Sequence, residues 1–163
     1  MAEEKIDAII AYHDAVKKLF DNKSTQIFSN NSLEHATAIL IEIFKHAEEH
    51  VRIFSYNLEE KAWSNGDLRK AIADAYARDV DIKVAIQKET VSDTSISDFF
   101  KQLGVDIMVG RAPDVVFNFV EADQKMFRFE EDKNICHAVA CANNNEVSMK
   151  LHDAFDCFMQ KVG

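Results

Sequence analysis

The sequence has little of what loop-rich, collagen-like or disulfide-bonded proteins need. Its 163 residues include four glycines, one proline and three cysteines. The cysteines, Cys136, Cys141 and Cys157, are odd in number and all lie in the last quarter, which suits a reducing compartment and not a disulfide framework. No apolar run approaches the roughly 20 residues of a membrane helix, and the acidic start MAEEKIDAII is not that of a signal peptide. We therefore expect a cytoplasmic protein with no membrane association.

Positive charge is also scarce. Lysine and arginine total 19 against 28 acidic residues, which gives a net charge of −9. Such a mean field repels nucleic-acid phosphates and anionic lipids, so both are disfavoured as partners, although a local basic cleft could exist within it. The acidic run Glu130, Glu131 and Asp132 is expected to be solvated.

Several sequence motifs that are typical of enzymes are absent. The four glycines are scattered, and none precedes a Lys-Ser or Lys-Thr pair as in a phosphate-binding loop. There is no G-x-S-x-G element to carry a hydrolase nucleophile. There is also no C-x-x-C pair, the commonest signature of zinc and thiol-redox sites. We expect no cofactor.

Hydrophobic periodicity, by contrast, is strong. Apolar residues recur at helical spacing in segments 3–21, 33–50, 66–78, 95–103 and 146–161. Runs typical of strands occupy 51–56, 80–87, 105–109, 115–121, 125–130 and 137–142, with a hairpin turn at 122–124. Helices and strands alternate in the first half, as in a parallel α/β layer, and the hairpin follows. The pattern predicts a helical extension, residues 1–24, and one α/β domain, residues 25–163, with a mixed sheet flanked by helices.

Two histidine-containing groups could in principle hold a metal ion. His46 and His50 lie four residues apart in the predicted helix 33–50, so their side chains could share one face. No third ligand is evident, and we expect both to lie on a solvated acidic surface. Cys136 and Cys141 flank His137, but their odd separation on a strand places the two thiols on opposite faces. We therefore expect no metal site in either group.

Four segments together carry a resemblance to a known family. They are VRIFSYNL (51–58), LRKAIADAYARDVDIKVAIQ (68–87), QLGVDIMV (102–109) and HAVACANNNEVSMKLHDAFDCFM (137–159). With the helix that precedes them, they resemble one half of a phospholipase D superfamily domain, from about Leu33 to Phe158. Asp79 stands where the family's turn usually has glycine. The resemblance implies a phospholipase D-like α/β fold.

The family's catalytic motif is degenerate in this sequence. That motif is H-x-K-x4-D, in which the histidine attacks phosphorus and the lysine stabilises phosphate charge. If Asp123 is its aspartate, the histidine position falls on Val116 and the lysine position on Asn118. Valine is no nucleophile and asparagine carries no charge. The family's downstream Gly-Ser-x-Asn element is also missing, so the resemblance implies the fold without the reaction.

The resemblance therefore implies a non-catalytic binding or adaptor module with a regulatory role. A retained cleft would be lined by residues at the expected strand ends, namely Ser55, Tyr56, Asn57, Asn118 and, nearby, His137. Family halves usually pair about a two-fold axis, so a single half implies a homodimer, and a protein partner is a further expectation. The alternative is a divergent, metal-independent phosphodiesterase or nuclease whose rearranged site uses His137 and Lys125.

Overall fold

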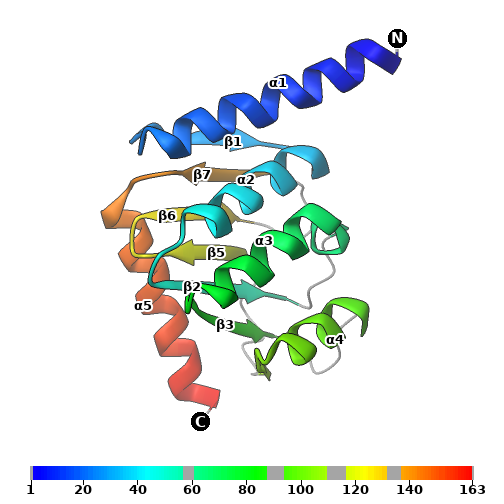
Figure 1. Cartoon of the computed structure of the whole chain (residues 1–163). Helices are drawn as coiled ribbons and strands as arrows, with labels where there is room; N and C mark the ends of the chain where they lie inside the picture. Colours follow the sequence, from blue (N-terminus) through cyan, green and yellow to red (C-terminus); the bar gives the residue numbers. More distant parts are fainter. Residues whose placement is uncertain (1, 57–60, 88–93, 110–116, 132–136, 163) are drawn as a thin grey trace.

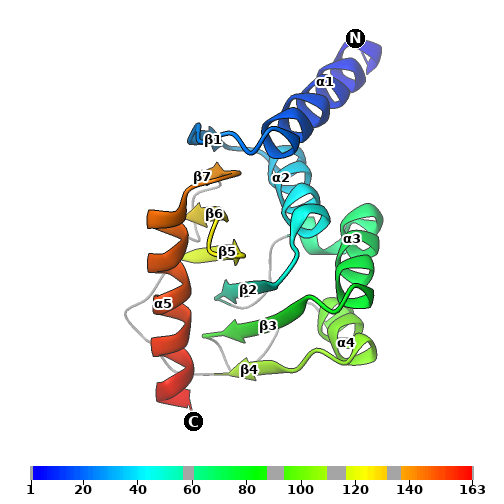
Figure 2. The same ribbon diagram turned by 60° about the vertical axis from the view of Figure 1, so that its left-hand side comes forward.

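A computed structural model of the chain (Figure 1) describes residues 2–56, 61–87, 94–109, 117–131 and 137–162. A single mixed sheet lies between two helical layers. On one face lie α2 (Leu33–His46), α3 (Gly66–Ala77), α4 (Thr94–Leu103) and the short 3-10 helix η1 (Lys61–Ser64), and α5 (Asn145–Val162) crosses the other face (Figure 2). The N-terminal helix α1 (Ala2–Asp21) packs beside α2. The predicted fold class, a mixed sheet flanked by helices and preceded by an N-terminal helix, is confirmed.

The described strands are β1 (Phe28–Asn30), β2 (His50–Ser55), β3 (Asp81–Ile86), β4 (Ile107–Val109), β5 (Asn118–Ala122), β6 (Met126–Glu130) and β7 (Ala138–Cys141). They pair in the order β1-β7-β6-β5-β2-β3-β4. Strands β2, β3 and β4 run parallel, and every other pairing is antiparallel. The edge strand β1 was not predicted, because its three residues carry too short a pattern to be distinguished from a loop.

Alternation along the strands divides the interior into two cores. On β2, Val51 and Ile53 belong to the large core beneath α2 and α3. The next residue, Phe54, belongs to a smaller, aromatic core beneath α5, which includes Phe119 and Phe155. Since successive side chains of a strand point to opposite faces, residue parity on β2 and β5 fixes which helical layer each polar side chain meets.

Helix α1 is only partly packed. Val16 and Phe20, near its C-terminal end, are buried in the large core. Ile6 and Ile10 are 55% and 54% exposed, and the N-terminal half of the helix projects away from the sheet (Figure 2). A boundary between extension and domain at residues 24 and 25 stays a prediction. None of the described helices has both the length and the apolar character required to cross a membrane.

Helix α2 ends earlier than the sequence predicts. Its last residue is His46, and Ala47 is already extended, with φ −65° and ψ 131°. The guanidinium of Arg78 donates hydrogen bonds to carbonyl oxygens at this helix end. The next three amides donate to the carboxylate of Asp123, and His50 opens β2. The prediction that His46 and His50 share a helical face is therefore wrong.

The predicted β5–β6 hairpin is confirmed. Asp123 and Gln124 both have positive φ, 56° and 57°. The amide of Lys125 donates to the carbonyl of Ala122 at 3.0 Å. Two central residues in the left-handed region define the type I′ turn, whose twist matches that of the strands it joins.

Candidate functional site

The end of β2 and the start of β5 bring three of the predicted cleft residues together. Phe54 pairs with Phe119 in this antiparallel ladder, so the next pair in register is Ser55 and Asn118. The amide of Tyr56 donates to Oδ1 of Asn118 at 2.8 Å. Asn57 lies outside the described residues. Whether this group binds a ligand stays a prediction.

His137 is exposed and directly precedes β7. Two steps across the sheet, through β6, separate it from β5, a distance of about 10 Å at the usual strand spacing. It therefore lies at the same end of the sheet as the Ser55–Asn118 group, two strands from Asn118 and three strands from Ser55.

Asn118 is held inside a buried polar chain that continues into β6. Its Nδ2 donates to Oε1 of Glu130 at 3.1 Å, and Nη2 of Arg128 lies 3.4 Å from the other oxygen of that carboxylate. Glu130 is 6% exposed and Arg128 is 3% exposed. The expectation that Glu130 is solvated is wrong, because its side chain points to the same face as Arg128, under α2. The alternating segment MFRFE carried that signal: two aromatic rings on one face, and two charged groups on the other.

The polar row extends to the edge strand. Asn30 pairs with Ala138, which pairs with Glu130, so Asn30 and Glu130 share the α2 face. Asn30 is 3% exposed, and neither atom of its amide has a hydrogen-bond partner within the described part of the chain. On α1, Tyr12 stacks on His35 with ring centroids 3.7 Å apart. Burial raises the pKa of Tyr12, although the charge of Arg128 acts in the opposite direction.

Asp123 has a structural role at the other end of β5. Its carboxylate accepts hydrogen bonds from the amides of Glu48, Glu49 and His50 at 2.8, 2.9 and 3.0 Å. Five residues of extended strand separate it from Asn118, which corresponds to about 17 Å. Of the three positions of the degenerate motif, Asp123 anchors the chain, Asn118 lies in the polar chain, and Val116 falls outside the described residues.

The rearranged catalytic pair considered above is not assembled. Lys125 lies at the hairpin turn before β6, whereas His137 lies beside the far end of that strand. About 17 Å of strand therefore separates their positions. One reacting atom could not contact both groups in one copy of the chain, so this arrangement does not favour the alternative in which His137 and Lys125 form one site.

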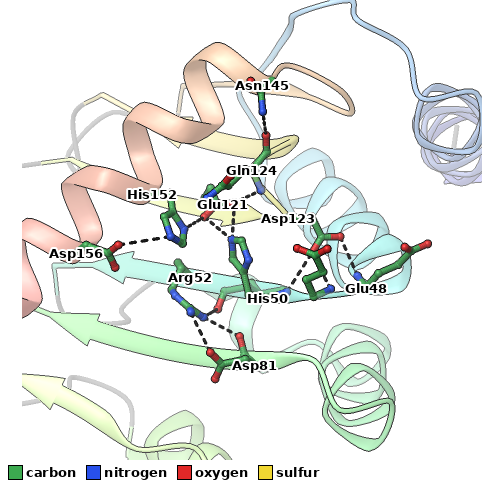
Figure 3. A network of polar contacts seen from close by, with 12 residues as sticks. Glu48, His50, Arg52, Asp81, Glu121, Asp123, Gln124, Asn145, His152 and Asp156 are labelled. Atoms are coloured by element: carbon green, nitrogen blue, oxygen red, sulfur yellow. Dashed lines mark hydrogen bonds and ion pairs between the residues drawn. The ribbon is translucent and has the colours of Figure 1, made fainter.

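A second polar cluster lies on the α5 face (Figure 3). The Nε2 atom of His50 is 2.9 Å from both carboxylate oxygens of Glu121, and Nδ1 of His152 is 2.8 Å from one of them. Glu121 is fully buried, and these three residues come from β2, β5 and α5. His46 lies elsewhere, with Nε2 bonded to Asp21 at 2.9 Å. Sequence reasoning missed Glu121 and His152, because no spacing along the chain links them.

Comparison with known proteins gives matches in structure alone. No protein-family model matches the sequence, and no curated protein matches it either. The phospholipase D family member Nuc from Salmonella typhimurium superimposes with a TM-score of 0.66 at 16% identity, over 83% of this chain and 95% of that one. NucT from Helicobacter pylori gives 0.61 at 15% identity, over 85% and 99%.

An archaeal chromatin protein has a similar architecture. TrmBL2, described as having a novel mode of DNA binding, gives a TM-score of 0.62 at 16% identity. The match covers 98% of this chain but only 64% of TrmBL2. Identities this low establish shared architecture and nothing about activity. Together with the mixed sheet and its helical layers, they show that this chain has a phospholipase D-like fold.

Proposed function

We propose that this chain is a non-catalytic phospholipase D-like binding module with a regulatory role, and that it acts as a homodimer. One observation carries the non-catalytic assignment. Asn118, at the position of the family's lysine, uses its amide within the domain: Oδ1 accepts from Tyr56 and Nδ2 donates to Glu130. A neutral amide held in this way supplies no charge to a phosphoryl oxygen, and Val116 supplies no nucleophile.

The charges near Asn118 favour a neutral polar ligand over a phosphodiester. Arg128 is the cation nearest to Asn118 along the polar chain, and its guanidinium is already neutralised by Glu130. The chain as a whole carries a net charge of −9, which repels anionic substrates at long range. Hydrogen-bonding groups without a full positive charge suit hydroxyl, amide or carbonyl groups.

The homodimer is supported by helix α1. Ile6 and Ile10 lie one turn apart on its projecting half and expose apolar surface that a second copy would bury. A two-fold axis that passes near these two residues would bring Ile6 of one copy against Ile10 of the other. A heterologous protein partner on the same surface is the competing outcome.

The test of the non-catalytic assignment is a hydrolysis assay in the presence of EDTA. Bis(p-nitrophenyl) phosphate and single-stranded DNA serve as substrates, and His137→Ala serves as the matched variant because His137 is exposed. We expect no turnover by either protein. Turnover that scales with protein concentration and disappears in His137→Ala would instead establish a divergent phosphodiesterase.

The homodimer is tested by sedimentation velocity. The wild-type chain is expected to sediment as a dimer, and Ile6→Glu with Ile10→Glu as a monomer. Met149→Glu provides the control, because Met149 is a comparably exposed apolar residue on α5, remote from α1. A monomeric wild-type protein, or a dimer that only Met149→Glu dissociates, would refute the α1 interface.

A further inference from the structure

We propose that His50, Glu121 and His152 form a binding site for a divalent transition-metal ion of the Zn²⁺ type, which ties α5 to the sheet. The site lies at the opposite end of β2 from Ser55 and on the opposite face of β5 from Asn118. It is therefore independent of the proposed binding function.

Strand register and helix placement bring the three donors together. Arg52 pairs with Glu121, so His50 lies diagonally across from Glu121 on the same face. Helix α5 crosses this face and contributes His152 (Figure 3). The nitrogen and oxygen donor atoms all lie within 4.8 Å of one another.

The distances are close to those of a coordinated ion. An ion about 2.0–2.1 Å from each donor in tetrahedral geometry needs donors about 3.4 Å apart. Two of the three separations, from Glu121 to each imidazole, are already 2.9 and 2.8 Å. Coordination therefore requires the carboxylate to withdraw slightly and the two rings to approach, a movement of about 1 Å that imidazole rotation can supply.

The donor set selects the class of metal. Two imidazoles and one carboxylate suit zinc, iron, nickel or copper, whereas magnesium and calcium prefer oxygen ligands. The side chains of His50 and His152 are 12% and 16% exposed, so an ion can enter between the rings, and Glu121 at 0% forms the floor. Three protein ligands leave a fourth position for water or for another donor.

Outer contacts already orient two of the ligands. Nε2 of His152 lies 3.5 Å from a carboxylate oxygen of Asp156, one helical turn later. A proton on that nitrogen leaves the Nδ1 lone pair directed toward the ion, the arrangement that carboxylates commonly impose on metal-bound histidines. The amide of Gln124 donates to Oε2 of Glu121 at 2.7 Å and fixes the carboxylate plane.

The nearest fixed positive charge on this face is already compensated. The Arg52 guanidinium donates to the carboxylate of Asp81 at 2.9 Å and to its backbone carbonyl at 2.7 Å. Without an ion, the imidazole nitrogens that face Glu121 lie at hydrogen-bond distance from its carboxylate. Metal binding replaces these contacts and requires both coordinating nitrogens to be free of protons.

The test is calorimetric titration of the metal-free full chain with Zn²⁺, in two buffers of different ionisation enthalpy to count released protons. We expect one ion per chain. His152→Ala should abolish saturable binding, and Asp156→Asn should weaken it by about 10–100-fold. His46→Ala is the matched control and should bind as the wild type does, because His46 bonds Asp21 away from the cluster. Mg²⁺ should give no saturable heat.

Two features keep the test decisive. Asp156 is 55% exposed, so Asp156→Asn leaves the fold intact even if His152→Ala does not, which circular dichroism would reveal. X-ray absorption spectroscopy at the zinc edge should show only nitrogen and oxygen ligands. Three results would overturn the site. They are a sulfur ligand at about 2.3 Å from the zinc, unchanged zinc binding in both His152→Ala and Asp156→Asn, and no saturable binding of Zn²⁺ by the wild type. None of these results bears on hydrolysis measured in EDTA.

Discussion

Asp123 is a residue whose contribution to folding can be calculated from its contacts. Its carboxylate accepts three backbone amides from the segment that joins α2 to β2. Its own φ of 56° is in the left-handed region, which asparagine, aspartate and glycine tolerate better than alanine. Substitutions at this position therefore separate the cost of the lost acceptors from the cost of the backbone conformation.

The expected loss in the free energy of unfolding differs among three substitutions of Asp123. Hydrogen bonds to a charged group contribute about 1.5–3 kcal/mol each when buried, and about 1 kcal/mol is appropriate here because two of the three are exposed to water. Asp123→Gly removes all three and should lower the free energy of unfolding by about 3 kcal/mol. Asp123→Ala adds about 1 kcal/mol of backbone strain, for a total of about 4 kcal/mol. Asp123→Asn retains one acceptor oxygen and should cost about 1–2 kcal/mol.

Urea unfolding followed by circular dichroism and fluorescence measures these differences, provided that the two probes give coincident transitions. The predicted order of stability is wild type, then Asn, Gly and Ala. Asp123→Ala within about 0.5 kcal/mol of the wild type would refute the assignment of Asp123 as an anchor, since that is the range of a neutral surface substitution. Equal losses for Gly and Ala would refute the contribution from backbone strain.

Two further substitutions test other parts of the packing. Gly104 has φ 98°, and a Cβ there would lie 2.7 Å from Oη of Tyr76. In the same urea assay, Gly104→Ala should therefore lower the free energy of unfolding by about 1–3 kcal/mol. Gly66→Ala is the control and should not lower it, because a Cβ at Gly66 would meet open space. The pKa of Asp21 is lowered by hydrogen bonds from Lys17 and then His46. Its stabilising effect is therefore present above pH 3.8 and lost as the pH falls further, so Asp21→Asn should differ from the wild type at neutral pH and converge with it in acid. A pH-independent difference would contradict this reasoning.

Periodicity predicted the long elements because their patterns are local. The helices that cover the sheet and the strands that form it carry apolar residues at spacings that one segment alone displays. Helix α2 was extended too far for the opposite reason. Residues 47–50 could continue the helix by propensity, but the carboxylate of Asp123, more than 70 residues later, takes the amides of 48–50. Such a long-range stop signal cannot be identified without the register of the hairpin.

The polar clusters also depend on contacts between distant segments, which the sequence alone does not reveal. The family resemblance grouped Ser55 and Asn118 as residues at the ends of strands, and the structure places them at neighbouring positions on β2 and β5. The burial of Glu130 was not predicted, because an acidic residue beside Glu131 has the pattern of a surface run. The group of His50, Glu121 and His152 required three independent facts: that α2 ends before residue 47, that β2 pairs with β5 in this register, and that α5 crosses their shared face.

The two ends of β2 suit different tasks because they are held differently. At its start, His50 is fixed twice: its amide donates to Asp123 and its imidazole contacts Glu121. Both acceptors belong to the end of β5 and the turn that follows it, so this end of the sheet presents donors already positioned for an ion, which lowers the entropic cost of binding. At the other end, the amide of Tyr56 donates to the side-chain oxygen of Asn118 beyond the ladder. The polar row that includes Asn118 ends three strands away at Asn30, whose buried amide atoms lack partners among the described residues. Buried unsatisfied donors and acceptors carry a desolvation penalty that a ligand or water can remove. The physical expectation is therefore that a metal ion mainly stabilises the first end, whereas a ligand that supplies polar groups acts at the second.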